Sequence, residues 1–328
     1  MKAIVFDDFG SADVLRLADV PMPEVRPDDL LVKVMAAGVN RADLLQREGV
    51  YGAQTYGDSD ILGLEVAGEV IAVGNAVTGF AVGDRVMGIV GGGAYAQYAR
   101  LDSGLAAVIP AGLSFIDAAA VMESFVTAWE ALSNLGRIAE GETVLIHAAA
   151  GGIGSAAVQL AKSRGATVLA TASGNNIENV LALGADFVFD YKLVDFEAEI
   201  IDVTASLGVG LIIDFVGGSY LARNIRSLAP GGRLVQVGLL GRDENAIIPL
   251  GTVLHNHLQL LGTVMKSRSR AEKRAMIGRF SDQVLPMMGK GLQPVVGALY
   301  SFSAASDAHR RMEAGGVFGK IVLTDFHE

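Results

Sequence analysis

The pattern of apolar and polar positions divides the chain near Gly141. Before that point, short apolar runs alternate with turn residues such as Pro23, Pro27 and the pair Gly74-Asn75. The runs predict strands over Lys2–Phe6, Leu30–Ala36, Glu65–Val73 and Asp84–Ile89. Short strands separated by proline and glycine turns are typical of a mostly-β, barrel-like domain. A helical segment is predicted to follow, from Ser114 through Trp129 to Leu135.

After Gly141, short apolar runs alternate with helical segments. The runs predict strands over Thr143–His147, Thr167–Thr171, Phe187–Asp190, Leu211–Phe215, Arg233–Val237 and Leu260–Val264. The clearest helices are Ser155–Arg164, Ile177–Leu183 and Tyr220–Leu228, and Pro230–Gly232 is predicted as a turn before the fifth strand. This alternation predicts an α/β fold whose six-stranded, doubly wound parallel sheet has helices on both faces. The tail from Arg270, with a strand over Lys320–Leu323, is expected to fold back onto the N-terminal part.

The first of these strands leads into a glycine turn. The segment His147-Ala-Ala-Ala-Gly-Gly-Ile-Gly154 begins at the last residue of that strand, and a helix follows the turn. Strand, glycine turn and helix form the context of a dinucleotide fingerprint, present here as A-x-G-x-x-G with Ala149 at its first position. Gly151 would let the backbone approach a diphosphate, and Gly154 would let the helix pack closely on the strand. A buried structural turn is the alternative, and a membrane helix over the uncharged Thr143–Ala161 is opposed by the adjacent glycines within it.

Composition narrows the function further. A chain of 328 residues, 51% apolar and 19% charged, is expected to form two well-buried domains. The net charge of −10 disfavours nucleic acid or an anionic membrane as partner, although Lys266–Arg270 forms a local basic stretch. The absence of cysteine excludes disulfides, thiolate catalysis and cysteine-bound zinc. The N-terminus becomes acidic too early for a signal peptide, so a cytoplasmic protein is expected.

The segment after the second strand of the sheet bears on the nucleotide. NAD enzymes usually place an acid there to hold the ribose 2′-hydroxyl, but Thr171–Asn176 contains none. A carboxylate would repel a 2′-phosphate, so its absence favours NADP. Lys192 beside Tyr191 either supplies charge to that phosphate or lies on a solvated loop, and Asn175-Asn176 fits a turn equally well.

Several distinct short motifs follow one another along the whole chain. They are Gly38–Gly49 with Tyr51, Gly63–Gly68, Val82–Val86, Gly92–Tyr98, Phe125–Trp129, the glycine turn and Phe318–Val322. In this respect the chain resembles the medium-chain dehydrogenase/reductase superfamily, in particular its zinc-free quinone oxidoreductase branch, the zeta-crystallin-like enzymes. The resemblance implies a GroES-like catalytic domain over 1–122 and 266–328, and a Rossmann nucleotide-binding domain over 123–265.

The resemblance also implies roles for particular residues. Zinc members carry a cysteine near Asn40 and a histidine near Leu64, so no metal is expected here. Asn40 would donate to a substrate carbonyl and Tyr51 would orient the acceptor or give it a proton; the alternatives are a turn asparagine and a rim tyrosine. The implied cofactor residues are Thr127, Gly151, Gly152, Ile153, Ser173, Tyr191, Val216, Gly238, Leu239, Leu240, Phe318, Gly319 and Lys320. Ser173 and Tyr191 would flank the 2′-phosphate, and Thr127 would bind the nicotinamide unless its hydroxyl bonds to its own helix.

Together these observations favour an NADPH-dependent reductase of quinones or other conjugated carbonyls, because without a Lewis acid an electrophilic acceptor is the easier substrate. An enoyl or enal double-bond reductase is one alternative. A crystallin-like NADPH-binding protein with a structural or nucleic-acid-binding role is another. The apolar edge strand 259–264 is expected to join two copies of the chain into a homodimer. His255 and His257 are expected to end a helix beside that strand.

Overall fold

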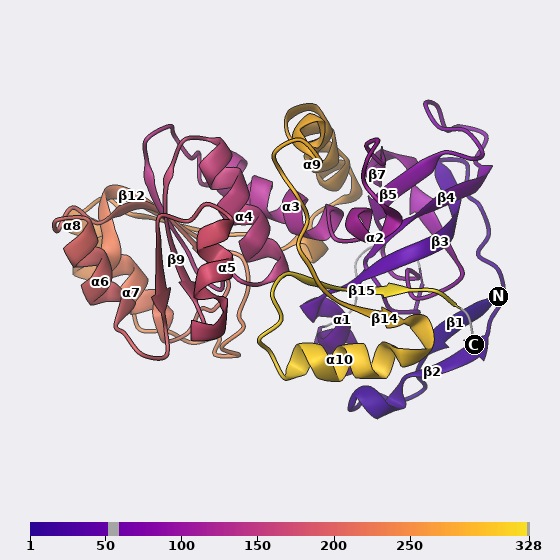
Figure 1. Cartoon of the computed structure of the whole chain (residues 1–328), viewed down its shortest axis with the longest axis horizontal. Helices are drawn as coiled ribbons and strands as arrows, with labels where there is room; N and C mark the ends of the chain where they lie inside the picture. Colours follow the sequence, from indigo (N-terminus) through magenta and orange to yellow (C-terminus); the bar gives the residue numbers. More distant parts are fainter. Residues whose placement is uncertain (52–58, 327–328) are drawn as a thin grey trace. The chain divides into compact units, whose positions relative to one another are not determined.

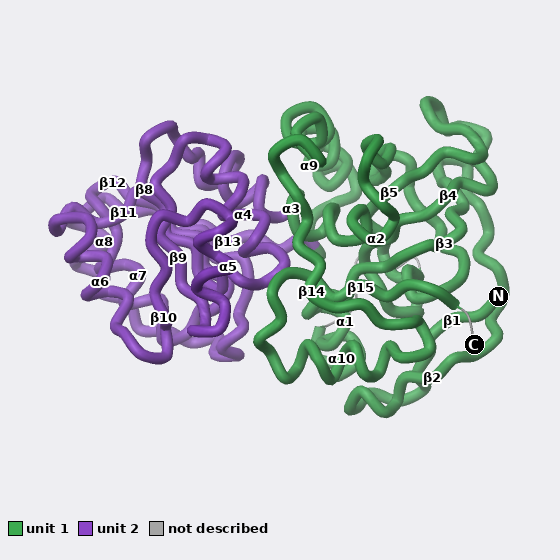
Figure 2. Tube along the Cα trace, in the orientation of Figure 1, with its two compact units in different colours: residues 1–126, 266–328 green, residues 127–265 purple. Residues whose placement is uncertain are grey.

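The computed structural model describes residues 1–51 and 59–326. Its contacts divide the chain into two units, Met1–Val126 with Lys266–Glu328, and Thr127–Met265 (Figure 2). Unit 1 is therefore discontinuous in sequence, and the first boundary lies inside helix α3 (Met122–Trp129).

Unit 1 is built on a seven-stranded sheet, drawn with its helices in Figure 1. Its order is β14 (Val296–Ser301), β15 (Lys320–Thr324), β3 (Asp29–Val39), β4 (Glu65–Val73), β5 (Arg85–Ile89) and β7 (Ala106–Val108), and β6 (Tyr98–Asp102) pairs with β3. A separate hairpin joins β1 (Lys2–Val5) to β2 (Arg16–Asp19). The C-terminal β15 runs antiparallel to β3, with Val322 opposite Gly38, so the tail does fold back onto the N-terminal part.

The helices of unit 1 include α1 (Arg41–Arg47), α2 (Phe115–Ala118), α9 (Arg270–Gln283) and α10 (Ala305–Glu313). The segment expected to be helical from Ser114 to Leu135 is instead interrupted between α2 and α3, and it ends in a π-helical turn over Glu130–Leu135. The interruption at Ala119–Val121 is fully buried. A Cβ on Gly38 would lie 2.4 Å from the Ala119 carbonyl oxygen, so this break lets the chain pack against β3.

Unit 2 contains the predicted parallel sheet. Its strand order is β10 (Phe187–Asp190), β9 (Thr167–Ala172), β8 (Thr143–Ile146), β11 (Val209–Asp214), β12 (Leu228–Gln236) and β13 (Gln259–Gly262). Figure 1 shows α4 (Gly152–Ser163) and α5 (Ile177–Ala182) on one face, with α6 (Phe196–Val203), α7 (Tyr220–Ser227) and α8 (Leu250–His255) on the other. The fold class expected from the sequence is thus confirmed in both units.

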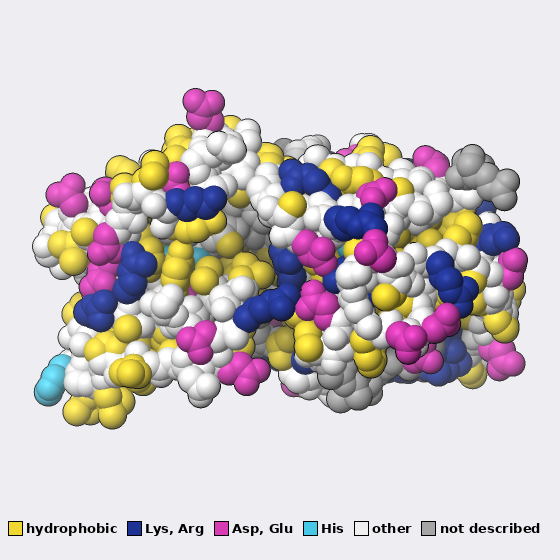
Figure 3. Space-filling model, turned by 90° about the horizontal axis from the view of Figure 1, so that it is seen from below, with side chains coloured by type: hydrophobic (Ala, Val, Ile, Leu, Met, Phe, Trp, Pro, Cys, Tyr) yellow, Lys and Arg dark blue, Asp and Glu magenta, His cyan; other side chains and the backbone are white. Residues whose placement is uncertain are grey.

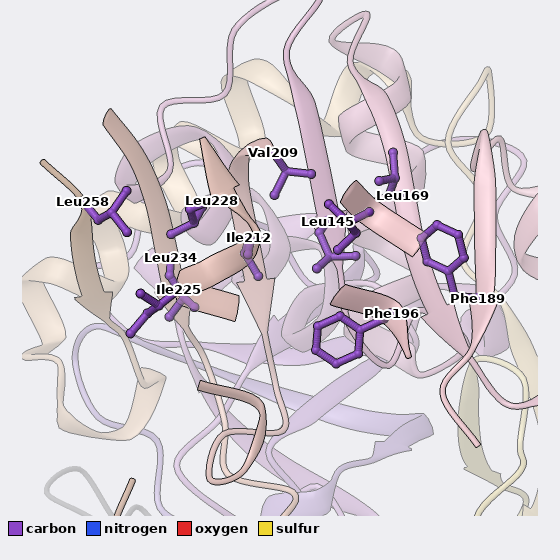
Figure 4. Packing of buried hydrophobic residues seen from close by; sticks show 11 residues of the cluster. Leu145, Leu169, Phe189, Phe196, Val209, Ile212, Ile225, Leu228, Leu234 and Leu258 are labelled. Atoms are coloured by element: carbon purple, nitrogen blue, oxygen red, sulfur yellow. The ribbon is translucent and has the colours of Figure 1, made fainter. Parts of the chain in front are cut away.

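The core of this sheet is formed by side chains such as Leu145, Phe196, Ile212, Ile225 and Leu234 (Figure 4). All five are at most 1% exposed. Leu145, Ile212 and Leu234 lie on strands that are nearly continuous apolar runs, and Phe196 and Ile225 pack on them from α6 and α7. Burial on both faces of the sheet leaves polar side chains room only at its edges and strand ends. The candidate site lies at these strand ends.

Most element boundaries in unit 2 differ from expectation by one to three residues, and the largest difference is at β12. β12 begins at Leu228 rather than at Arg233, because Pro230–Gly232 forms a bulge within the strand instead of a turn before it. Gly231 takes a φ of +75° there, and its amide donates to the carbonyl of Asn256. Helix α8 ends at His255, as expected, while β13 ends at Gly262.

Candidate functional site

The glycine turn of unit 2 has the geometry that a diphosphate site needs. Gly151 is the extended N-cap of α4, and no side chain caps the helix. A Cβ on Gly154 would lie 2.3 Å from the carbonyl oxygen of Ala148, so only glycine allows this close packing of helix and turn. At Gly151 the nearest neighbour of such a Cβ is 3.4 Å away. The first amides of α4 and the helix dipole are therefore available to an anion beside an open backbone.

The other strand ends bring the remaining cofactor candidates of unit 2 to the same edge of the sheet. Ser173 follows β9, Tyr191 follows β10, and Val216 follows β11. Gly238, Leu239 and Leu240 follow β12, and the amide of Leu240 donates to the Phe215 carbonyl at 2.9 Å. Leu239 and Leu240 are each 47% exposed, although they are apolar. Gly152 and Ile153 open α4 itself, and Thr127 lies half-buried on α3.

A carboxylate that the sequence did not point to reaches the Ser173 region. Asp190 ends β10, the strand beside β9, and its Oδ2 would lie 2.7 Å from a Cβ on Gly174. Its Oδ1 accepts from the Lys192 amide at 3.0 Å. The usual acid of NAD enzymes follows the second strand, whereas Asp190 ends the third strand, which pairs with the second. The order of strands in the sheet is the signal that would have found it.

In unit 1, Asn40 joins a buried ionic cluster. Its Nδ2 donates to Glu65 Oε1 at 3.0 Å and to the Gly38 carbonyl at 3.3 Å, while its Oδ1 accepts from the Lys320 ammonium. Lys320 also forms an ion pair with Glu65, and the two residues are 4% and 1% exposed. Glu65 Oε2 accepts from the Glu123 amide at 3.0 Å. The amide of Asn40 is therefore held by this cluster, and the Lys320 side chain lies buried within it.

A second polar cluster includes Asp43 and Arg47 of α1. The Asp43 carboxylate accepts from the backbone amide of Asn40 at 2.7 Å and from the Tyr95 hydroxyl at 3.2 Å. The same hydroxyl is 3.2 Å from His309 Nε2, and Arg47 contacts His309 Nδ1 at 3.4 Å. Burial raises the pKa of Asp43 to about 7 and lowers that of His309 to about 3. The backbone amide of Asn40 thus donates to an acid whose pKa lies near neutral.

Two further groups of unit 1 belong to this region. Burial, and then the Glu65 carboxylate, raise the pKa of Glu123 to about 8. Burial also raises the pKa of Tyr51, with smaller contributions from Glu123 and Asp43. The Lys266 ammonium lies 4.1 Å from the centre of the Tyr51 ring and also donates to the Tyr51 carbonyl. Tyr51 is therefore a neutral phenol that contacts the Lys266 ammonium.

Phe318 and Gly319 lie just before β15 and shape the backbone that leads to Lys320. Gly319 has a φ of +84°, and a Cβ there would lie 2.2 Å from the Val295 carbonyl oxygen. The Lys320 amide donates to that same carbonyl at 2.8 Å. Glycine is therefore required at 319 for packing alone.

Neither a metal cluster nor a membrane span is found in residues 1–51 and 59–326. No three His, Cys, Asp or Glu side chains there come together as a metal site. No helix in this part of the chain is both long and apolar enough to cross a membrane. On the face in Figure 3, lysine and arginine side chains are interspersed with aspartate and glutamate. In the basic stretch, Arg270 pairs with Asp102 and Lys266 contacts Tyr51.

Both halves of the chain match known domain families. The family described as alcohol dehydrogenase GroES-like domain matches residues 26–111, and the one described as zinc-binding dehydrogenase matches residues 152–282. A phenolphthiocerol/phthiocerol polyketide synthase polypeptide of Mycobacterium tuberculosis is 33% identical over 320 residues, 97% of this chain. The chain spans only 14% of the length of that synthase polypeptide.

Solved structures cover the chain almost completely. An NAD-dependent alcohol dehydrogenase is 33% identical with a TM-score of 0.84, covering 99% of this chain and 100% of its own. The quinone oxidoreductase of Coxiella burnetii is 33% identical with a TM-score of 0.79, over 99% of both chains. The CurK enoyl reductase is 26% identical with a TM-score of 0.87, over 98% of both chains. With both domains matched, the chain belongs to the medium-chain dehydrogenase/reductase superfamily, a group of oxidoreductases whose members bind nicotinamide dinucleotides.

Proposed function

We propose that the protein is an NADPH-dependent reductase that passes reducing equivalents to quinones or other conjugated carbonyls without a metal. The observation that carries this proposal is the ionic cluster of Asn40, Glu65 and Lys320. The resemblance puts the cysteine of the zinc members near Asn40 and their histidine near Leu64, the residue before Glu65. The three side chains are bound to one another and supply no metal Lewis acid. Such a site suits an acceptor that can be reduced without one. Conjugated acceptors meet this condition, since they are already electrophilic.

The residues of unit 2 fit a dinucleotide. The open backbone at Gly151, the uncapped start of α4 and the small contact distance at Gly154 form a cradle for the diphosphate. The reduced nicotinamide, when bound, supplies a hydride. This chain supplies binding and orientation, through Gly151, Gly152, Ile153, Val216 and Gly238–Leu240.

The choice of NADPH rests on Ser173, which stands where NAD enzymes usually have an acid. Tyr191 is 43% exposed beside it and offers a hydroxyl for the 2′-phosphate. The Asp190 carboxylate opposes this preference. Parallel titrations with NADPH and NADH measure the balance, and Asp190→Asn is expected to shift it further toward NADPH.

Tyr51 is proposed to orient the acceptor or give it a proton, since its neutral phenol is fixed by Lys266. Tyr51→Phe should lower kcat with a quinone by roughly tenfold or more, and NADPH affinity should stay unchanged. Tyr300→Phe, on β14, is the matched control. Full activity of Tyr51→Phe would remove Tyr51 from the mechanism.

A second candidate is reduction of an enoyl or enal double bond. The similarity to the CurK enoyl reductase and to polyketide synthases favours it. Comparing kcat/KM for a quinone and for an α,β-unsaturated aldehyde or thioester separates the two. A nucleotide-binding structural protein, the third candidate, would bind NADPH and turn over none of these acceptors.

We propose that two copies pair through β13. This strand ends the sheet, Leu260 is 40% exposed on it, and α8 beside it exposes Leu250 and Leu254 by 68% and 69%. Unpaired edges with apolar neighbours favour association with a second copy.

A further inference from the structure

Four side chains form a continuous hydrogen-bonded chain near the strand ends of the unit 2 sheet, where the candidate cofactor residues lie. Thr171 Oγ1 lies 2.9 Å from His147 Nδ1, and His147 Nε2 lies 2.7 Å from Asn224 Oδ1. Asn224 Nδ2 donates to Asp214 Oδ2 at 3.0 Å. All four residues are at most 1% exposed, so water does not compete for these bonds. The chain links β9, the end of β8, α7 and β11.

The chain of bonds has a single direction. The Asn224 amide donates to a carboxylate, so its carbonyl oxygen faces His147 and must accept. His147 Nε2 therefore carries the proton. Burial lowers the pKa of His147, which keeps the ring neutral, so Nδ1 accepts from the Thr171 hydroxyl. The Asp214 carboxylate at one end thus sets the tautomer of His147 at the other.

Aromatic side chains pack against the His147 ring. Phe196 and Tyr220 contact the His147 ring edge to face, with centroids 4.8 and 5.0 Å away. The charged groups nearest to the ring are Asp214 and Arg223, and Arg223 lies over Phe196 and pairs with Asp195. The imidazole is therefore held by aromatic faces and by two hydrogen bonds along its own plane.

Both ends of the chain reach candidate cofactor loops. His147 is the residue before the glycine turn, and the amide of Ala149 in that turn donates to the Thr171 carbonyl at 3.0 Å. At the other end, Asp214 Oδ1 accepts from the amides of Val216 at 2.6 Å and Gly217 at 3.3 Å. A single polar chain therefore fixes the backbone on two sides of the proposed dinucleotide site.

We infer that His147, Asn224 and Asp214 are positioning residues for the dinucleotide, which hold the glycine turn and the Val216–Gly217 loop in their binding geometry. This inference rests on the proposed nucleotide-binding function. None of the three is proposed to touch the cofactor. Each acts through the backbone of its neighbours, as groups behind a binding site commonly do.

Asp214→Asn tests the inference because it should reverse every bond in the chain. The new amide would donate to Asn224, whose side chain would turn over and present its NH₂ to His147 Nε2. His147 would then carry its proton on Nδ1 and donate to Thr171. Nitrogen NMR of histidine-labelled protein without nucleotide should show this change of tautomer. The NADPH dissociation constant should rise about fivefold to thirtyfold, since a neutral amide holds the loop amides less firmly.

Two further variants complete the test. Asp202→Asn, on the exposed face of α6, makes the same chemical change and should alter neither readout. Thr171→Val cuts the other end of the chain, so it should weaken NADPH binding while His147 keeps its proton on Nε2. It gives a result even if Asp214→Asn does not fold.

The inference is overturned if His147 keeps its Nε2 proton in folded Asp214→Asn. It is also overturned if Asp214→Asn and Thr171→Val both bind NADPH as tightly as the wild type. Failure of the wild type to bind any nicotinamide nucleotide would instead refute the proposed function. The tautomer measurement, made without nucleotide, tells these two failures apart.

Discussion

Replacing Lys320 by methionine should destabilise unit 1 strongly. The change removes the only described cation that contacts Glu65, a carboxylate that is 1% exposed. Loss of one partner from a buried ion pair costs about 3–5 kcal/mol. Glu65 would keep its bonds to the Asn40 side chain and the Glu123 amide, both at 3.0 Å, so the lower end of that range applies. For a unit of this size, about 3 kcal/mol lowers the unfolding midpoint by roughly 6–12 °C.

Calorimetry and urea unfolding of Lys320→Met measure this cost. The double variant Glu65→Gln/Lys320→Met should recover most of the stability, since the glutamine side chain can still accept from Asn40. Lys2→Met removes an exposed partner of Asp19 and should leave stability nearly unchanged.

A loss of less than about 1 kcal/mol in Lys320→Met, the range of exposed pairs, would refute this reasoning. The double variant also separates two roles of Lys320. If the lysine serves only the cluster, the restored protein should bind NADPH like the wild type. If stability returns but NADPH affinity stays low, Lys320 contacts the nucleotide, as the resemblance of the sequence implies.

Three further predictions follow from single contacts. Gly154→Ala should lower the free energy of unfolding by roughly 1–3 kcal/mol and weaken NADPH binding, because its Cβ would lie 2.3 Å from a carbonyl oxygen. Gly251→Ala, with open space around it, is the control and should change neither quantity. Calorimetry and NADPH titration measure both. His309→Gln should lose less stability than the wild type as pH falls from 6.5 toward 3, because the lowered pKa of His309 makes the unfolded chain bind the extra proton in that range; urea unfolding against pH checks this. Leu260→Lys should convert a dimer to monomer in light scattering, whereas Leu181→Lys, exposed to a similar degree on α5, should not.

Most of the fold of unit 2 could be predicted from the hydrophobic pattern of the sequence. Parallel strands buried on both faces are recognisable as apolar runs, so all six strands and their order of appearance were predicted. The predicted strand boundaries were wrong where a contact between distant backbone segments determines them. The bulge at Pro230–Gly232 depends on the pairing of β12 with β11, which no local signal in the sequence reports. Helix α6 was expected only from the alternation of strands and helices, without bounds, and the tail has two helices, α9 and α10, where one was expected. The short strands β2, β6 and β7 of unit 1 were not predicted.

The site was predictable where a local rule applies. The glycine turn follows from sequence alone, because close backbone packing demands glycine at 154. The Glu65–Lys320 pair and the bonds from Thr171 to Asp214 join residues that are distant in the chain. Only the sheet topology brings these residues together. A single acid or histidine beside an apolar run, as at Glu65 and His147, is the one sequence signal that could have pointed to them.

The central claim is tested most directly by steady-state NADPH oxidation with a quinone, followed without oxygen and after removal of metals by a chelator. The account predicts turnover that saturates in both substrates, survives the chelator, and is faster with NADPH than with NADH. Tight NADPH binding without turnover of any quinone or conjugated carbonyl would contradict it, as would activity that returns only when zinc is added.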